Sequence, residues 1–299
     1  MSKELMKSVP YYKTHYGKAY LGDTLELIKQ VPDNSIDLIA TSPPYGLRKK
    51  KEYGNADPEV YINWFMPFAK EFYRVLKPEG SFVLNIGGGW EKGKPTRSLY
   101  QFELLIELCK TFNLAEEFVW YKPATLPTPA EWVTIRRIRV KDAIEYVWWL
   151  SKTPYPKADN RKVLQPYSNS MESLLKKGYK AKLRPSGHNI STKFSINNGG
   201  SIPPNFLSFS NTESNSHYLN MCKKHEIKPH PARFPLALPQ FFIEFLTDEG
   251  DHVLDPFAGS NVTGEAAENL KRKWLSFELS KDYLKGSKFR FDFNQTHLH

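Results

Sequence analysis

A rigid polar corner is encoded at residues 41–47, TSPPYGL. Pro43 and Pro44 lack backbone N–H donors and restrict the chain, so their carbonyls have no local helical partner. The Ser42 oxygen and a proline carbonyl could together accept hydrogen bonds from one ligand amino group, and the Tyr45 ring offers a planar base a stacking surface. Such a corner would hold an exocyclic amine with its lone pair directed at an electrophile. The alternative is a strand-end turn capped by Ser42.

A second motif, LDPFAGSNVTGEAAE at 254–268, places an acid at a strand end before small turn residues. Gly259 lets the backbone approach a ligand closely. Glu278 ends the next strand 19 residues later, near the spacing of about 20 at which an acid binds ribose hydroxyls in nucleoside-binding βαβ units. The motif lacks G-x-G-x-x-G and carries Asp255 where a pyrophosphate would lie. It therefore favours S-adenosylmethionine over a dinucleotide. A tight turn with an acidic cap is the alternative.

Positive charge dominates the composition. The 299 residues include 42 Lys+Arg against 32 Asp+Glu, which gives a net charge of +10. Thirteen of these cations lie within residues 136–184, against four acids, and Arg48, Lys49, Lys50 and Lys51 follow the proline corner directly. A surface of one sign attracts a polyanion, so we expect double-stranded DNA as a partner. A basic protein that is merely soluble is the alternative.

The two cysteines, Cys109 and Cys222, form neither a metal-ligand pattern nor a disulfide framework. Cys109 is predicted in a helix core, and neither cysteine stands in a sequence that suits covalent attack on a cytosine ring. No stretch has the length and hydropathy of a signal peptide or a membrane span. We therefore expect a cytoplasmic protein that uses neither a metal nor a membrane.

The elements that must position these motifs alternate between strands and helices. Strands are predicted at 18–23, 35–42, 81–87, 115–123, 143–152 and 272–280. Helices are predicted at 24–31, 59–76, 98–112, 238–247 and from 281 onward, and 251–268 is read as strand, loop and helix. The segment KPEG at 77–80 is predicted as a turn. The alternation predicts an α/β fold with a largely parallel sheet and helices on both faces.

The stretch 153–227 has a different composition, rich in Pro, Ser, Asn, Gly and Lys with little periodicity. Its scattered Tyr, Phe and Leu favour an irregular folded insertion over a disordered linker. The insertion divides the chain into a catalytic half, 1–152, and a cofactor-binding half, 228–299. Within it, Arg184 and His188 are candidates for reading base edges, with phosphate contacts or loop hydrogen bonds as alternatives.

TSPPY and DPFAGSN together resemble the amino-methyltransferases of bacterial restriction–modification systems. Here the corner precedes the cofactor loop and the basic segment lies between them, which is the β-class order of that family. Serine at the start of S-P-P-Y resembles the cytosine-N4 branch. The likeness covers nearly the whole chain, through RIRVKDA, RPSGH, GGSIPPN and HPARFP. It implies a seven-stranded, mostly parallel, circularly permuted sheet with an antiparallel strand at one edge and a target-recognition insertion.

The resemblance also assigns roles to residues. Those implied to hold S-adenosylmethionine are Asp255, Phe257, Gly259 and Ser260 at its methionine and adenosine parts, Glu278 on the ribose, Asp23 near the adenine, and His230 and Arg233 near the methionine. Those implied to hold the target base are Ser42, Pro43, Pro44 and Tyr45.

The implied reaction is direct methyl transfer to the amino nitrogen of a cytosine turned out of duplex DNA. Ser42 and the Pro43 carbonyl would orient the amine, and the ring of Tyr45 would replace lost stacking. The proton would leave to solvent without a dedicated base. A cognate restriction endonuclease would be a separate protein, not part of a stable complex. Adenine-N6 methylation, methylation of RNA or a protein amide, and a non-catalytic DNA-binding module stay open as alternatives.

Overall fold

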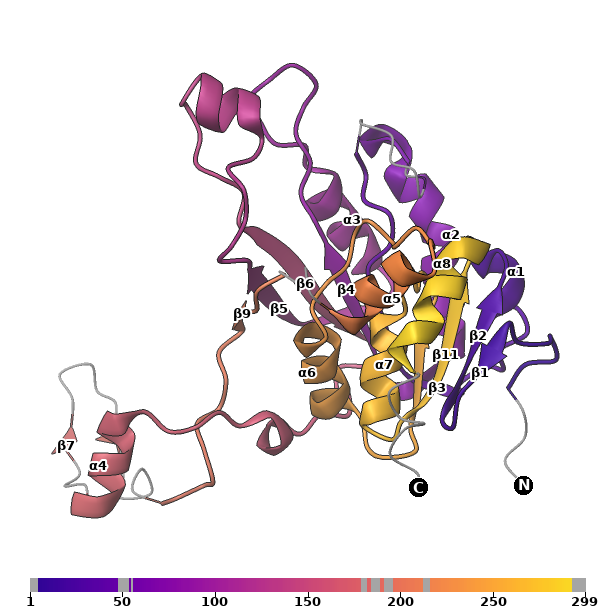
Figure 1. Cartoon of the computed structure of the whole chain (residues 1–299). Helices are drawn as coiled ribbons and strands as arrows, with labels where there is room; N and C mark the ends of the chain where they lie inside the picture. Colours follow the sequence, from indigo (N-terminus) through magenta and orange to yellow (C-terminus); the bar gives the residue numbers. More distant parts are fainter. Residues whose placement is uncertain are drawn as a thin grey trace. The chain divides into compact units, whose positions relative to one another are not determined.

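The computed structural model describes residues 5–47, 54, 56–178, 182–183, 189–190, 196–211 and 216–291 (Figure 1). The chain forms two compact units, a small one of Asp159–Pro204 and a large one made of the residues before and after it. The predicted insertion, 153–227, extends beyond the small unit at both ends.

The large unit is built on a nine-stranded sheet in the described part of the chain. Its strands are β1 (Tyr12–Lys13), β2 (Gly17–Leu21), β3 (Ile36–Thr41), β4 (Leu76–Ile86), β5 (Asn113–Tyr121), β6 (Ile144–Ser151), β9 (Phe206–Ser208), β10 (His252–Asp255) and β11 (Lys273–Glu278). Their order across the sheet is β1-β2-β11-β10-β3-β4-β6-β5-β9.

Most neighbouring strands of this sheet are parallel. β1 is antiparallel to β2 at one edge, and β6 is antiparallel to both of its neighbours inside the sheet. The predicted α/β class with a mostly parallel sheet is confirmed. The predicted number of seven strands is wrong, because the short strands β1 and β9 extend the sheet at its two edges.

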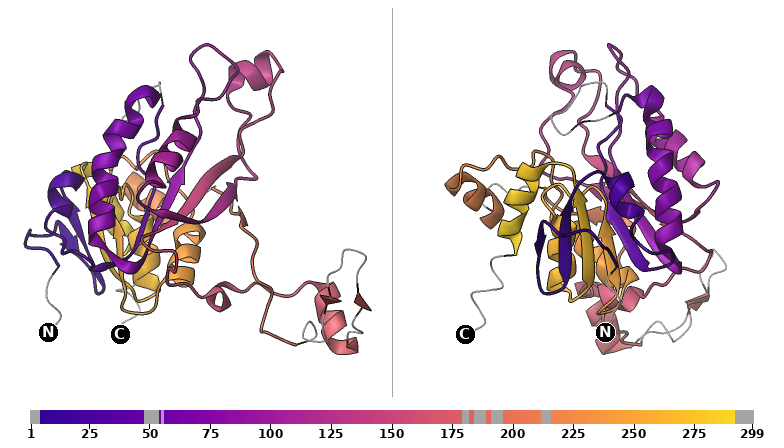
Figure 2. Two further views of the ribbon diagram at one scale, coloured as in Figure 1. Left: turned by 180° about the vertical axis from the view of Figure 1, so that it is seen from behind. Right: turned by 90° about the vertical axis from the view of Figure 1, so that its right-hand side faces the viewer.

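Helices cover both faces of the sheet, as the two views of Figure 2 show. One face carries α1 (Thr24–Ile28), α2 (Tyr61–Val75) and α3 (Tyr100–Leu108). The other carries α6 (Ala237–Leu246), α7 (Val262–Asn269) and α8 (Lys281–Ser287), with α5 (His217–Lys224) packed against α8. None of the helices in the described part of the chain is long and apolar enough to cross a bilayer.

Two hydrophobic cores follow from the alternation of side chains along the strands. In β4, Phe82 and Leu84 belong to the core with α1–α3, whereas Val83 belongs to the core with α6–α8. In β6, Trp148 and Trp149 divide in the same way. Strands covered on both faces must be apolar throughout, which explains the continuous hydrophobic runs of the sequence.

Helix α2 confirms the helix predicted at 59–76, since Phe65 and Phe72 are buried on its sheet-facing side. The turn predicted at 77–80 is wrong. These residues lie within β4, where Leu76 pairs with Ile36 and the next paired residue is Ser81, so the segment forms an irregularity in the strand.

The small unit contains a 3₁₀ turn (Asn160–Val163), helix α4 (Asn169–Lys177) and the antiparallel pair β7 (Lys182–Leu183) and β8 (Asn189–Ile190). Ser168 caps α4 by accepting a hydrogen bond from the Met171 N–H at 3.3 Å. Helix α4 buries none of its residues, and Lys176 and Lys177 are exposed in its last turn. The unit therefore presents cations in an ordered helix.

Candidate active site

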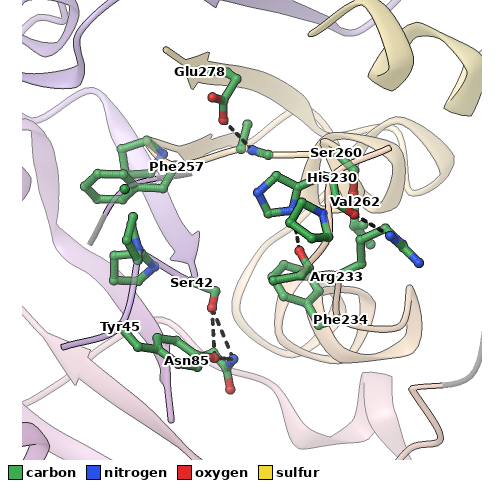
Figure 3. A pocket seen from close by; sticks show the side chains of 18 of the residues that line it. Ser42, Tyr45, Asn85, His230, Arg233, Phe234, Phe257, Ser260, Val262 and Glu278 are labelled. Atoms are coloured by element: carbon green, nitrogen blue, oxygen red, sulfur yellow. Dashed lines mark hydrogen bonds between the residues drawn. The ribbon is translucent and has the colours of Figure 1, made fainter. Parts of the chain in front are cut away.

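A cavity of about 680 Å³ opens at the carboxyl ends of the neighbouring parallel strands β2, β11, β10 and β3. Asp23 follows β2, Ser42 follows β3, Pro256 follows β10 and Glu278 ends β11, and all four line the cavity. Open α/β sheets bind ligands outside the carboxyl ends of their strands. The fold thus brings the proline corner and the glycine loop together, although they lie far apart in the sequence (Figure 3).

The loop after β10 is held by its own polar side chains. Asp255 is buried and accepts hydrogen bonds from the Thr41 hydroxyl at 2.6 Å and the Phe257 N–H at 3.1 Å. Burial raises the pKa of Asp255, and these donors oppose the rise. Asn261 caps α7 by accepting from the Gly264 N–H at 3.2 Å. Asp255 therefore braces the loop and is not among the residues that line the cavity.

Glu278 presents its carboxylate at the end of β11. The Gly259 N–H donates to one oxygen at 2.8 Å, as Figure 3 marks, and the Ser280 N–H donates to the other at 2.7 Å. Burial raises the pKa of Glu278, and the two backbone donors act against this. A carboxylate has about four lone-pair sites, so the group can still accept from a pair of neighbouring hydroxyls.

The imidazole of His230 lies over Gly259. A Cβ on residue 259 would come within 3.2 Å of this ring, and the residue has a φ of +52°, so both the contact and the backbone favour glycine. His230 Nδ1 donates to the Ala232 carbonyl, and the ring meets Tyr283 edge-on with centroids 4.5 Å apart. Burial lowers the pKa of His230 to about 4, so the ring is neutral at pH 7.

Two arginines support this side of the cavity. Arg233 lines the cavity and donates to the His230 carbonyl. Arg290 donates to the Ser260 carbonyl at 2.7 Å and to its hydroxyl at 3.1 Å, and it pairs with Glu265 at 2.7 Å. Arg290 was not predicted from the sequence. It commits the Ser260 hydroxyl to the fold, so Ser260 contributes loop shape to the cavity wall.

An aromatic group forms another wall. Phe257 packs against Trp64 and Phe68 of α2, with ring centroids 6.0 and 5.1 Å apart. Asp23 stands beside them in the cavity and caps α1, accepting from the Leu25 N–H at 2.8 Å. Trp64 and Phe68 belong to the helix predicted at 59–76, whose periodicity indicates an apolar face but no role in a cavity. Rings next to an acidic cap suit a planar heterocycle that carries an amino group.

The proline corner forms the opposite part of the cavity. The Tyr61 hydroxyl donates to the Pro44 carbonyl at 2.8 Å, which commits that carbonyl to the fold. Ser42 Oγ lies 3.2 Å from the Tyr45 hydroxyl and 3.3 Å from Asn85 Nδ2 (Figure 3). The corner is therefore fixed by side chains from α2 and β4 as well as by its prolines.

Residues 36–289 match the profile of a family described as DNA methylase, of the N6/N4 type. The chain belongs to this family. It is 53% identical over 287 residues to the type II methyltransferase M.PvuII of Proteus hauseri, with 94% of this chain and 85% of the relative covered. It is 29% identical over 290 residues to the type II methyltransferase M.BglII of Bacillus subtilis, with 95% and 71% covered.

Solved structures agree with this assignment. One described as PvuII DNA methyltransferase (cytosine-N4-specific) superposes with a TM-score of 0.77 at 47% identity, covering 94% of this chain and 88% of that one. A putative DNA modification methylase from Thermus thermophilus, complexed with S-adenosyl-L-methionine, shares the fold with a TM-score of 0.57 at 21% identity, covering 92% and 93%. The predicted resemblance to DNA amino-methyltransferases is confirmed, and the protein is a DNA methyltransferase.

Three polar side chains near the corner of this methylase were not predicted from the sequence. Asn85 of β4, Lys122 after β5 and Glu145 of β6 all line the cavity. Lys122 pairs with Glu145 at 2.6 Å, and each side chain is only 15% exposed. The available signal was a lone polar residue beside an apolar run, VLNIG for Asn85 and AIEYVWW for Glu145.

Neither cysteine of the methylase lines the cavity. Cys222 is buried in α5. Cys109 is exposed at the C-terminal cap of α3, so its predicted place in a helix core is wrong, because the helix ends at Leu108. In the described part of the chain, no three His, Cys, Asp or Glu side chains gather as a metal site would need.

The DNA-contacting residues predicted at Arg48, Lys49, Lys50, Lys51, Arg184 and His188 lie outside the described residues. Other cations are described on an arm, residues 123–143, that the methylase extends between β5 and β6 (Figure 1). A π-helical turn (Glu131–Ile135) lies on this arm. Arg136 follows it, and its guanidinium lies 5.2 Å from the Trp132 ring centroid. The arm also exposes the aliphatic side chains of Leu126, Ile135, Ile138 and Val140.

Proposed function

We propose that this methyltransferase transfers a methyl group from S-adenosylmethionine to the N4 amino nitrogen of a cytosine turned out of duplex DNA. One observation carries the proposal: the Ser42 corner and the loop joined to Glu278 line the same cavity. Its volume of about 680 Å³ falls within the roughly 300–1,000 Å³ of small-molecule sites. The serine that opens the corner and the 47% identity to the structure described as cytosine-N4-specific PvuII DNA methyltransferase support cytosine as the base.

The cofactor half fits S-adenosylmethionine by the chemistry of its groups. Glu278 offers acceptors for ribose hydroxyls, and Phe257 and Trp64 offer rings for adenine. Asp23 offers an acceptor for the adenine amino group, and Arg233 a cation for the methionine carboxylate. When bound there, the cofactor supplies a methyl group carried on a positively charged sulfur.

The base half acts through this chain's own groups. Ser42 Oγ and the Pro43 carbonyl accept hydrogen bonds from the two N–H groups of the target amine, which orients its nitrogen and stabilises the positive charge that develops on it. Holding the reacting groups in line lowers the barrier, because the entropy of bringing them together is already lost when they bind. The Tyr45 ring offers a stacking surface to the extruded base, worth roughly 1–3 kcal/mol. The transfer is a direct displacement, and we propose that it needs no metal.

DNA would be held by cations outside the cavity. The arm at 123–143 carries clustered arginines, one of them against the Trp132 ring, and a cluster of cations on one segment is the electrostatic mark of a nucleic-acid surface. The segment 48–51 would contact phosphates beside the extruded base, and Arg184 and His188 in the 153–227 insertion would read base edges. The enzyme would work on chromosomal DNA in the bacterial cytoplasm and protect it from a separate cognate endonuclease.

The test uses the purified protein with methyl-labelled cofactor and unmethylated genomic DNA, with and without EDTA. Digestion to nucleosides should yield labelled N4-methylcytosine in both conditions. Labelled N6-methyladenine would overturn the choice of base, and loss of transfer with EDTA would overturn the metal-free proposal. DNA binding without any labelled nucleoside would mean that the protein is a non-catalytic DNA-binding module.

A further inference from the structure

Ser42 is the first member of a hydrogen-bonded chain that ends at a carboxylate. Its hydroxyl lies 3.2 Å from the Tyr45 hydroxyl. The Tyr45 hydroxyl in turn donates to Glu145 Oε2 at 2.8 Å. Asn85 Nδ2 approaches the same carboxylate oxygen at 3.0 Å, and Lys122 Nζ donates to the other at 2.6 Å. The carboxylate is thus bound on both oxygens and connected to the corner.

The direction of the protons in this chain follows from its end. An ionised carboxylate only accepts hydrogen bonds, so the single phenolic proton of Tyr45 goes to Glu145. Burial, assisted by the nearby negative charge of Glu145, raises the pKa of Tyr45, which keeps that proton in place. The Tyr45 oxygen then acts only as an acceptor, from Asn85 Nδ2 at 2.8 Å and from the Ser42 hydroxyl at 3.2 Å. The Ser42 proton is therefore directed away from the base. One lone pair of its oxygen faces Asn85 Nδ2 at 3.3 Å, and the other is left to accept from the target amine.

We propose that Glu145 is the terminal proton acceptor of a relay that runs from the target amine through Ser42 and Tyr45. This inference rests on the proposed function. Lys122 and Asn85 act as positioning residues, because they donate to the two oxygens of the carboxylate and hold it against Tyr45. The sequence alone predicts that the proton leaves without a dedicated base, and it assigns a role only to the ring of Tyr45.

The relay moves one proton and no electrons. Once the amine carries the new methyl group, its nitrogen is positively charged and one N–H bond breaks. Ser42 Oγ takes that proton while its own moves to Tyr45, whose proton moves to Glu145 Oε2. Ser42 and Tyr45 end unchanged, the methylated amine is neutral, and Glu145 is a neutral acid. Its proton then leaves to water, to which the Glu145 side chain is 15% exposed.

The experiment measures single-turnover methylation of duplex DNA by Glu145→Gln, Tyr45→Phe and the double variant, with cofactor and DNA saturating. Each single change should lower the rate by on the order of 10²-fold, the usual contribution of a positioned acid or base. The double variant should be no slower than either single one, because both changes interrupt one chain. Dissociation constants for cofactor and DNA should stay within about threefold of the wild-type values. If the two residues had a merely structural role, binding would weaken together with the rate.

Two kinds of control keep the result interpretable. Glu145→Gln leaves the half-buried Lys122 without its partner, which can destabilise the fold, so Lys122→Met combined with Glu145→Gln removes the pair together. Glu71→Gln, which breaks a pair with Arg74 on α2, and Tyr73→Phe are the matched changes outside the cavity and should leave the rate unchanged.

The outcomes separate the relay from the proposed function. Wild-type rates in Tyr45→Phe or in Lys122→Met with Glu145→Gln would overturn the relay while the function stands. So would a double variant about 10⁴-fold slower than wild type, because independent losses multiply. No methylated cytosine from the wild-type protein would overturn the proposed function and the relay with it.

Discussion

The group that each half of the cavity presents, Glu278 in the cofactor half and Ser42 in the base half, is held by a different kind of hydrogen bond. In the cofactor half, the backbone N–H groups of Gly259 and Ser280 satisfy Glu278. In the base half, Ser42 is held by the side chains of Tyr45 and Asn85, which in turn meet the half-buried ion pair of Lys122 and Glu145. Every residue but proline supplies a backbone N–H, whereas a side-chain network loses a member with each substitution. We therefore expect base-half substitutions to change chemistry and cofactor-half substitutions to change binding or stability.

The sharpest expectation is for Ser42→Ala. The change removes one acceptor for the target amine and leaves the prolines and the Tyr45 ring in place. Single-turnover transfer should fall by roughly 10²–10³-fold, as for loss of one preorganised polar contact to a transition state. Affinity for cofactor and DNA should be retained in calorimetry and gel-shift measurements. A wild-type rate would mean that Ser42 only caps a turn, and that substitutions in the base half do not act on chemistry as expected.

The next largest effect concerns the pH dependence of stability through His230, in the cofactor half. In the folded protein the pKa of His230 is about 4, below the ordinary value of 6.5. Between these two pH values the unfolded chain therefore binds a proton at His230 and the folded protein does not. Stability is therefore fully present above pH 6.5 and lost as the pH falls toward 4, by on the order of 3 kcal/mol.

Urea unfolding of wild type and His230→Gln at a series of pH values between 7.5 and 4 would measure this. Glutamine gains no charge, so the variant should lose less stability than wild type on acidification. The difference between the two proteins isolates His230 from His252, whose pKa is also lowered by burial. Parallel curves of unfolding free energy against pH would show that protonation of His230 does not destabilise the folded protein.

Glu278→Ala should weaken S-adenosylmethionine binding roughly 10- to 100-fold, the cost of charge-assisted hydrogen bonds worth about 1.5–3 kcal/mol. Calorimetry with Glu278→Gln beside it separates the charge from the shape, because glutamine keeps one acceptor oxygen. Transfer at saturating cofactor should change far less than in Ser42→Ala. A rate that stayed low at saturation would mean that the cofactor half also governs chemistry.

The smallest effect is expected outside both halves. DNA affinity should fall steeply with salt, and Lys176→Gln with Lys177→Gln should flatten the log–log slope by about 0.9 for each phosphate that is no longer neutralised. The control, Lys29→Gln with Lys110→Gln, removes the same charge elsewhere. Lys29 follows the last residue of α1, Lys110 lies two residues after the end of α3, and both are exposed. Equal slopes in the two double variants would assign the DNA surface to other cations, such as those of the arm.

The corner and the glycine loop could be located from the sequence because each is a local motif. Gly259 and Ser42 are recognisable from their immediate neighbours. Asn85, Lys122 and Glu145 were missed because strand pairing, which local pattern does not encode, brings β4, β5 and β6 together. The place of Trp64 in the cavity was missed because periodicity marks an apolar face without showing where that face ends at a cavity. The three-residue strand β9 was too short for any periodic signal.

The cap of α7 has an evolutionary consequence. Asn261 is fully buried with a φ of +60°, and its side-chain oxygen accepts from both the Gly264 N–H and the Ser276 hydroxyl. A Cβ on residue 264 would overlap that same oxygen. Replacing either residue alone therefore removes the cap or collides with it, and a viable change requires several positions to mutate together. We expect lineages to inherit this loop as a block, whereas the surfaces that face DNA can diverge one residue at a time.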